Sequence, residues 1–272
     1  MSNNTYSIAV LLPTHKRTDA LTRSVKSVIE NADKPTNLQI IFGVDHNDII
    51  GQAHLNDVIY PYLDEQGVDY IAVGFEPMGY LGLNHYYNGT AAEADADWLF
   101  VWNDDAFITS KGWDSEICKH DGEFKLLKIH THNEHPYSIF PIYPKEWYDL
   151  FGFLARHQMI DAELSQNAYM LNLMQIIEVY ATHDRADLTG NNDDATQRNK
   201  ISLEGNPNNP RDFHHINYIN ARMSDCEIIS QHLKSKGKDM NFWDNVKLGK
   251  QDPWGKMREN DPNGQVVSIP IN

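Results

Sequence analysis

Apolar runs and amphipathic stretches alternate along the first half of the chain. Four short apolar runs predict buried strands, at residues 7–12, 38–44, 68–73 and 99–102. Between these runs, apolar residues recur at helical spacing over residues 21–29, 53–62 and 81–94. Strands that alternate with helices predict an α/β fold, in which a mostly parallel sheet is flanked by helices on both faces.

The second half of the chain has a less regular pattern. It predicts strands at residues 124–130, 138–142 and 176–180 and helices at residues 144–150 and 162–173. Residues 189–210 are rich in Asn, Asp, Gly and Pro, which predicts a long loop.

A last helix is expected over residues 212–236, because apolar residues recur there at helical spacing. The stripe consists of Phe213, Ile216, Ile219, Met223 and Ile228. Beyond this helix, Trp243 and Trp254 stand among polar residues and predict that the tail packs on the body. We therefore expect one domain over residues 1–188, followed by a loop and a helical C-terminal extension over residues 189–272.

Composition and charge narrow the possible partners. The 272 residues suffice for one large domain, and the net charge of −15 disfavours binding to nucleic acids or anionic membranes. A nucleic-acid acceptor is therefore not expected. No segment reaches the roughly 18 apolar residues of a membrane span, and the polar residues 1–5 predict no secretory signal. Cys118 and Cys226 are expected to be thiols, which is typical of a cytoplasmic protein.

The most informative motif follows the predicted strand that ends at Trp102. There the chain continues as Asn103-Asp104-Asp105, so two neighbouring carboxylates stand at the carboxyl end of a buried strand. Open parallel sheets bind ligands at the carboxyl ends of their strands. Carboxylate oxygens at such an edge suit Mg²⁺ or Mn²⁺ bound together with a substrate phosphate.

Other motifs follow in a recognisable order along the chain. The first strand ends in Pro13-Thr14-His15-Lys16-Arg17, the second ends at Asp45, and a segment over residues 79–89 precedes the Asn103-Asp104-Asp105 strand. A later histidine, His183, follows another apolar strand. In this order the chain resembles the GT-A fold, family-2-like, nucleotide-sugar-dependent glycosyltransferases over residues 6–185.

The resemblance implies a Rossmann-like sheet with a nucleotide-binding half over residues 1–105 and a smaller acceptor-side half over residues 106–188. It also implies which residues bind the nucleotide sugar: Pro13, Thr14, Arg17, Asp45, Gly79, Asn84, Asn103 and Asp104. Asp105 would ligate the metal directly, and His183 would be a further ligand that suits Mn²⁺, with Asp184 or Asp187 as alternatives to His183. Asn103 stands where the family's Asp-x-Asp motif has its first carboxylate.

An inverting transfer also needs a general base that accepts the proton of the acceptor hydroxyl. The resemblance places this base at Asp161, with Glu163 as the second candidate. Asp161 is equally suited to cap the helix that begins there. A retaining mechanism stays open, since both kinds of enzyme share the metal site.

The predicted activity is transfer of a sugar from a nucleoside diphosphate donor, with a UDP-sugar favoured, to a hydroxyl group of a glycan or another acceptor. One alternative is a nucleotidyltransferase that forms the nucleotide sugar. The absence of glycine from residues 13–18 argues against it, since that class has a Gly-rich phosphate loop there. A second alternative is a catalytically silent module that binds glycans or a protein, and Asn103 keeps it open.

Overall fold

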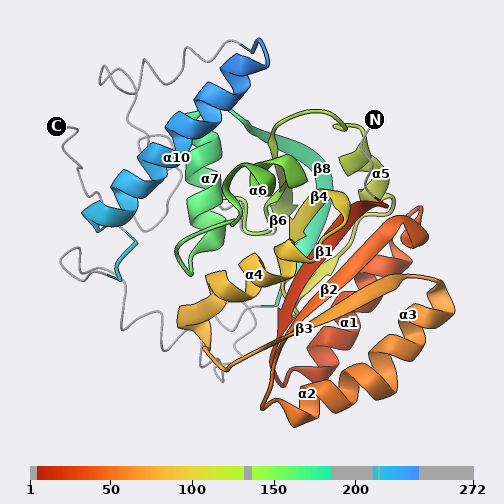
Figure 1. Ribbon diagram of the computed structural model, residues 1–272. Helices are drawn as coiled ribbons and strands as arrows, with labels where there is room; N and C mark the ends of the chain where they lie inside the picture. Colours follow the sequence, from red (N-terminus) through yellow and green to blue (C-terminus); the bar gives the residue numbers. More distant parts are fainter. Residues whose placement is uncertain (1–4, 132–136, 185–210, 214, 239–272) are drawn as a thin grey trace.

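The computed structural model describes residues 5–131, 137–184, 211–213 and 215–238 (Figure 1). In these residues, eight strands form one curled sheet in the order β3-β2-β1-β4-β7-β6-β8-β5. The strands are β1 (Tyr6–Thr14), β2 (Leu38–Asp45), β3 (Asp69–Phe75), β4 (Ala96–Val101), β5 (Ala106–Ile108), β6 (Leu126–Thr131), β7 (Ile142–Pro144) and β8 (Met174–His183). The first four strands of this order are parallel, whereas β7 and β5 run antiparallel to their neighbours.

Helices cover both faces of the sheet (Figure 1). They are α1 (Thr18–Glu30), α2 (Ile49–His54), α3 (Tyr60–Gln66), α4 (Leu83–Ala92), α5 (Trp113–Cys118), α6 (Lys145–Phe151), α7 (Ile160–Met170) and α10 (Ile216–Ser235). A π-helical turn, Leu55–Ile59, joins α2 to α3, and 3-10 turns occupy Pro35–Asn37 and Tyr80–Gly82. Among the described residues, no helix has the length and apolar character to cross a membrane.

The period-two pattern of β1 explains how the core divides into two layers. Ile8, Val10 and Leu12 point to one face and pack with residues of α1 and α3. Ala9 and Leu11 point to the other face and pack with residues of α4, α6, α7 and α10. The central strands are thus buried on both faces, as the continuous apolar runs predict.

The free edge of β5 lies against α1 and not in solvent. Its last residue, Ile108, donates its amide proton to Ser27 Oγ at 3.0 Å and accepts a hydrogen bond from Asn31 Nδ2 at 2.9 Å. Polar side chains of α1 therefore satisfy the backbone groups that an edge strand leaves unpaired. The Ser24 hydroxyl of α1 also donates to the Asn103 carbonyl at 3.1 Å, which holds the residues that precede β5 against the same helix.

Most of the predicted elements are present, and the predicted α/β class is confirmed. The strand predicted at residues 138–142 is wrong: only Ile142–Pro144 forms a strand there. Pro141 has no amide proton to donate, although its carbonyl accepts from Val101 at 3.0 Å. The pattern also missed β5 and α5, which are too short to show a period. The predicted loop at residues 189–210, Asp187, Trp243 and Trp254 lie outside the described residues.

The predicted last helix is present as α10, but its buried face is not limited to the apolar stripe. Ile228 is 39% exposed, whereas Arg222, Asp225, Cys226 and Ile229 are buried. The buried face of α10 therefore contains two charged residues, which a hydrophobic pattern cannot identify as buried. This face packs on α7.

Candidate functional site

The carboxyl ends of β1, β2 and β4 lie at one edge of the sheet, because these strands are parallel. Just beyond β4, the Trp102 amide donates to the Leu11 carbonyl at 3.0 Å, and the chain then turns through Asn103 and Asp104. Strand β5 follows immediately and pairs with β8, so that Ala106 lies opposite His183. The topology thus brings the predicted metal-binding motif and His183 together, as the order of the motifs implied.

Arg17 lies between the two neighbouring carboxylates. Its Nη1 atom is 2.7 Å from Asp105 Oδ2 and 3.2 Å from Asp104 Oδ1. The Thr14 hydroxyl donates to Asp104 Oδ2 at 2.9 Å. Thr14 is the last residue of β1 and Arg17 lies three residues further on, so the end of the first strand supplies partners of the carboxylates that follow β4.

His183 completes this cluster from the side of β8. Its Nε2 atom is 2.9 Å from Asp105 Oδ1 and 3.3 Å from Asn103 Nδ2. Its Nδ1 atom is buried and has no hydrogen-bond partner in the part of the chain that the structure describes. The amide of the next residue, Asp184, donates to the Asp105 carbonyl at 2.8 Å, which fixes the two segments to each other.

Burial and charge act in opposite directions on the two carboxylates. Burial raises the pKa of Asp104 to about 6, against the lowering effect of Arg17. Burial also acts to raise the pKa of Asp105, but the hydrogen bond with His183 and the charge of Arg17 outweigh it and lower that pKa. Asp105 is therefore the carboxylate whose charge its surroundings favour.

The residue types at this cluster fit a divalent cation. Two carboxylates and an imidazole are the donor set that suits Mn²⁺. Their arrangement does not form a ready metal site. Among the described residues, no three or more His, Cys, Asp or Glu side chains are placed so that they could hold a metal ion together. The gap between Asp104 and Asp105 is bridged by the guanidinium group of Arg17.

Tyr87 on α4 joins the cluster, although no sequence signal singled it out. Its hydroxyl lies 2.8 Å from both the Trp102 carbonyl and Asn103 Oδ1. Burial raises the pKa of Tyr87 well above its ordinary value, and the charges of Asp104, Asp105 and Asp161 raise it further. Asp161 of α7 is thus one of three carboxylates whose charge raises the pKa of this buried hydroxyl.

Asp45, at the end of β2, lies in a second cluster of polar groups. The Tyr86 hydroxyl donates to Asp45 Oδ1, and His15 Nδ1 lies 3.0 Å from Asp45 Oδ2. His15 also lies 3.8 Å from Asp48, which accepts from the Lys16 amide at 2.8 Å. Tyr86 and His15 were not predicted from the sequence. Both side chains surround the carboxylate that the family resemblance assigns to the base or ribose.

Three further predicted nucleotide-binding residues, Pro13, Gly79 and Asn84, lie outside the two clusters. Gly79 precedes α4, and Asn84 lies in its first turn. Gly79 has φ 58° and ψ −158°, a conformation that residues with a side chain rarely adopt. Pro13, the last but one residue of β1, is half-buried opposite Gly43 of β2. Asn84 Nδ2 donates to the Arg156 carbonyl at 3.1 Å, so this asparagine contacts the segment between α6 and α7.

Residues 154–157 form a connector whose backbone is bound by side chains of two helices. Asn88 of α4 accepts from the amides of Leu154 and Ala155 at 2.8 and 3.2 Å and donates to the Ala155 carbonyl at 2.9 Å. Glu163 of α7 accepts from the amides of Arg156 and His157, the latter at 2.9 Å.

The two candidates for the general base have different surroundings. Asp161 lies in the first turn of α7 and is partly exposed, and no side chain caps that helix. The capping role that the sequence allowed for Asp161 is therefore not the one it has. Glu163 is 1% exposed, and its carboxylate is engaged by backbone amides. These contacts favour Asp161 as the residue with a carboxylate available to a ligand.

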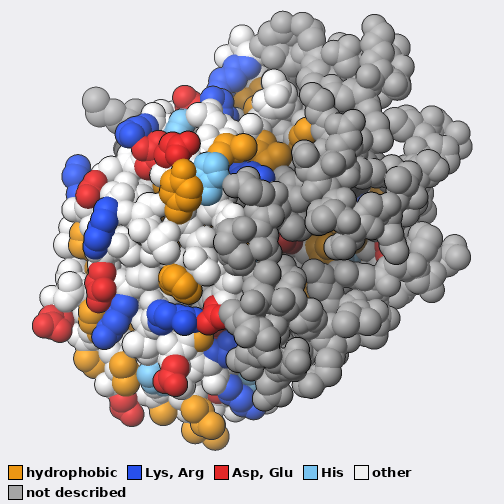
Figure 2. All heavy atoms as spheres, turned by 180° about the vertical axis from the view of Figure 1, so that it is seen from behind, with side chains coloured by type: hydrophobic (Ala, Val, Ile, Leu, Met, Phe, Trp, Pro, Cys, Tyr) orange, Lys and Arg blue, Asp and Glu red, His pale blue; other side chains and the backbone are white. Residues whose placement is uncertain are grey.

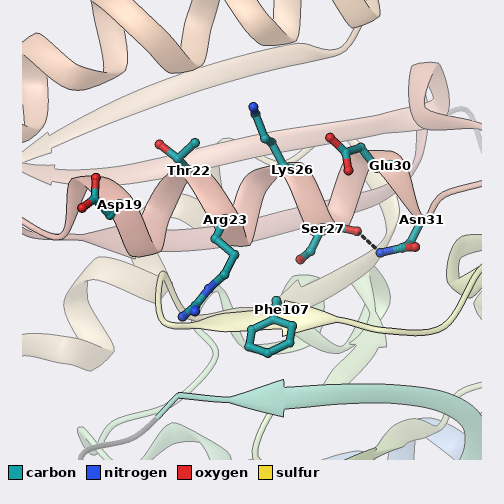
Figure 3. Close-up of a pocket in the computed structure, with 8 residues that line it drawn as sticks. All are labelled: Asp19, Thr22, Arg23, Lys26, Ser27, Glu30, Asn31 and Phe107. Carbon is teal, nitrogen blue, oxygen red and sulfur yellow. Dashed lines mark hydrogen bonds between the residues drawn. The ribbon is translucent and has the colours of Figure 1, made fainter. Parts of the chain in front are cut away.

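A separate hollow lies along the outer side of α1 (Figure 3). Its lining residues are Asp19, Thr22, Arg23, Lys26, Ser27, Glu30, Asn31 and Phe107. Arg23 lies over the Phe107 ring, 4.8 Å from its centroid, and forms an ion pair with Asp184. None of the predicted site residues lines this hollow, so it is distinct from the cluster around Asp105.

No protein-family model and no curated protein matches the chain by sequence. Solved structures do match. The mannosyltransferase PcManGT from Pyrobaculum calidifontis, determined with GDP-Man and Mn²⁺, matches over 94% of this chain and 85% of its own, at 10% identity and a TM-score of 0.54. S. aureus TarS 1–349 in complex with UDP matches over 94% of this chain and 81% of its own, at 13% identity and a TM-score of 0.50.

A further TarS structure has a TM-score of 0.51 and 14% identity over 67% of this chain, which spans 38% of that protein's length. The chain has a GT-A-like fold. In this GT-A-like fold, one cluster contains six of the predicted site residues: Thr14, Arg17, Asn103, Asp104, Asp105 and His183. Asp45 lies in a second cluster at the same edge of the sheet.

Proposed function

We propose that the chain is a metal-dependent glycosyltransferase that moves a sugar from a nucleoside diphosphate donor to a hydroxyl group of an acceptor. The observation that carries the proposal is the cluster at the carboxyl ends of the parallel strands, where Arg17 and His183 both contact Asp105. A transferase needs one set of groups that holds the diphosphate, for which the cluster around Asp105 is the candidate. It also needs one base that faces the acceptor, for which Asp161 is the candidate. The structural neighbours with UDP or GDP-Man support a nucleotide-sugar donor.

On the donor side, Pro13, Thr14 and Arg17 would line the nucleotide pocket, and Asp45 would contact the base or ribose. Gly79, Asn84, Asn103 and Asp104 would complete the contacts to the nucleotide sugar. An Mn²⁺ or Mg²⁺ ion bound by Asp105 and His183 would stabilise the charge that develops on the departing diphosphate. We favour a UDP-sugar as donor, as the sequence predicted.

On the acceptor side, Asp161 would accept the proton of the attacking hydroxyl. The hydroxyl oxygen then forms the new bond to the anomeric carbon while the bond to the diphosphate breaks, and the configuration inverts. Glu163 would position the connector at residues 154–157, because its oxygens already accept backbone amides. A glycan fits the acceptor class better than a nucleic acid, since the chain has a net charge of −15. The face in Figure 2 also mixes acidic and basic side chains, without one basic patch among its described residues.

The test is a calorimetric titration of UDP and of GDP into the protein, with and without Mn²⁺. We expect metal-dependent binding of one nucleotide, and at least about tenfold weaker binding by Asp105→Asn, which loses a charged ligand. Asp184→Asn is the matched control, because Asp184 follows His183 but pairs with Arg23. Its nucleotide affinity should equal that of the wild type.

Two results would contradict the proposal. If neither nucleotide binds with or without Mn²⁺, the chain is not a nucleotide-sugar enzyme, and a silent binding module becomes the better hypothesis. If Asp184→Asn weakens binding as much as Asp105→Asn does, the nucleotide does not depend on the cluster at Asp105.

A further inference from the structure

The position of Arg17 raises a question about how the carboxylates after β4 take up a cation. One guanidinium nitrogen, Nη1, lies 2.7 Å from Asp105 Oδ2 and 3.2 Å from Asp104 Oδ1. It thus contacts one oxygen of Asp105, the proposed metal ligand, and one oxygen of Asp104 beside it. Arg17 neutralises part of the charge of the pair, and it does so from within the gap between them.

The three side chains differ in how far they are from solvent. The Asp104 and Asp105 side chains are 9% and 14% exposed, whereas the Arg17 side chain is 37% exposed. A long, flexible arginine at the solvent side of the gap can turn away from it at small cost. The carboxylates cannot, because Asp104 is bound by Thr14 and Asp105 by His183.

The backbone of Arg17 is fixed while its side chain can move. Its carbonyl accepts from the Leu21 amide at 2.8 Å in the first turn of α1. The preceding Lys16 has φ 59°, and its amide is bound by Asp48. Movement of the guanidinium group therefore needs only rotation about side-chain bonds.

We infer that Arg17 is a displaceable counter-ion, which bridges Asp104 and Asp105 in the free protein and moves onto the diphosphate when a divalent cation takes its place. This inference rests on the proposed function and deepens it. A guanidinium group beside a divalent cation is repelled by it, whereas phosphate oxygens offer it a bidentate partner. Arg17 thus opposes binding of the cation alone and supports binding of the cation together with the nucleotide.

Reciprocal coupling follows from this exchange. If UDP gives Arg17 a new partner, UDP strengthens the binding of Mn²⁺, and Mn²⁺ strengthens the binding of UDP by the same factor. Removal of the guanidinium group should therefore raise the affinity for Mn²⁺ alone and reduce the coupling. If Arg17 instead replaced the metal permanently, its guanidinium group would stay on the carboxylates in every state. UDP would then not strengthen the binding of Mn²⁺.

The experiment titrates Mn²⁺ alone into the wild type, Arg17→Gln and Arg17→Lys, and then repeats each titration with UDP. We expect Mn²⁺ alone to bind Arg17→Gln on the order of tenfold more tightly, and UDP to strengthen Mn²⁺ binding less in this variant than in the wild type. Arg17→Lys should lie between the two, since an ammonium group keeps the charge but not the fork of donors. Arg23→Gln is the matched control on the same helix and should leave the affinity for Mn²⁺ unchanged.

Unchanged or weaker binding of Mn²⁺ alone by both Arg17 variants, with thermal unfolding curves that show them folded, would overturn the inference. Arg17→Lys decides the question if Arg17→Gln does not fold. Failure of the proposed function looks different: UDP then binds no variant under any condition. The titrations with Mn²⁺ alone still decide what Arg17 does in that case.

Discussion

The proposed donor side and the proposed acceptor side of the candidate site differ in which groups their side chains bind. On the donor side, Arg17 and His183 bind Asp105 through side chains alone, and the guanidinium group is partly exposed. On the acceptor side, Asn88 and Glu163 bind the backbone of residues 154–157, and both side chains come from helices. One region can exchange its partners, whereas the other fixes the path of the chain.

The difference separates two effects of mutation. Charged side chains that pair with one another at a partly exposed position contribute little to stability but much to ligand binding. Side chains that satisfy buried backbone groups contribute to stability, because those groups have no solvent to replace the lost partner. Substitutions on the donor side should therefore change affinity first, and those in the connector should change the free energy of unfolding first.

The largest expected effect concerns Asp161, which belongs to the acceptor side without binding the connector. Asp161→Asn removes the proposed base and should lower kcat by about 10²- to 10⁴-fold, with little change in nucleotide affinity. The measurement is the rate of UDP release from a UDP-sugar donor in the presence of an acceptor. If kcat changes less than about tenfold, Asp161 is not the base.

A matched control separates catalysis from stability in this experiment. Asp161 lies in the first turn of α7, where loss of an acidic residue costs about 0.3 to 1 kcal/mol. Asp19 has the same place in α1 and is exposed. Asp19→Asn should therefore lower stability by a similar amount and leave kcat unchanged.

A middle-sized effect is expected in the connector. Asn88→Ala leaves the Leu154 and Ala155 amides and the Ala155 carbonyl without their partner. We expect a loss of about 2 to 3 kcal/mol in the free energy of unfolding, measured by urea denaturation. Asn84→Ala, which removes one hydrogen bond to Arg156, should cost about 1 kcal/mol. Equal losses for the two variants would contradict this account of the connector.

The same contrast explains how much of the molecule could be predicted from the sequence. The buried strands β1, β2 and β4 are continuous apolar runs, and their parallel order places Thr14, Asp45 and Asp105 at one edge. The donor side thus follows from motifs that end strands. Strand β5 has three residues and no period, yet it sets the approach of His183 to Asp105.

The acceptor side depends on contacts that local patterns do not contain. The apolar stripe of α10 does not show its whole buried face, because that face also holds Arg222 and Asp225. Asp225 forms an ion pair with Arg156, whose backbone amide is bound by Glu163. A charged residue is expected at the surface unless its partner is known, and these partners lie far apart in the sequence. Tyr87 was not predicted either, because its contact with Asn103 exists only in the folded chain.

The smallest expected effect is the pH dependence of the connector. Burial raises the pKa of Glu163 above its ordinary value of 4.5, although the amides of Arg156 and His157 act to lower it. The folded state then binds more protons than the unfolded state above pH 4.5, so this group's contribution to stability falls as pH rises toward the raised pKa. Glu163→Gln has no titrating carboxyl group and so lacks this pH-dependent contribution to stability. The variant also loses one acceptor for a backbone amide. We expect the variant to be less stable than the wild type at pH 4.5 and the gap to narrow by pH 7, measured by paired urea denaturation. A gap that widens with pH would mean that the charged carboxylate stabilises the connector.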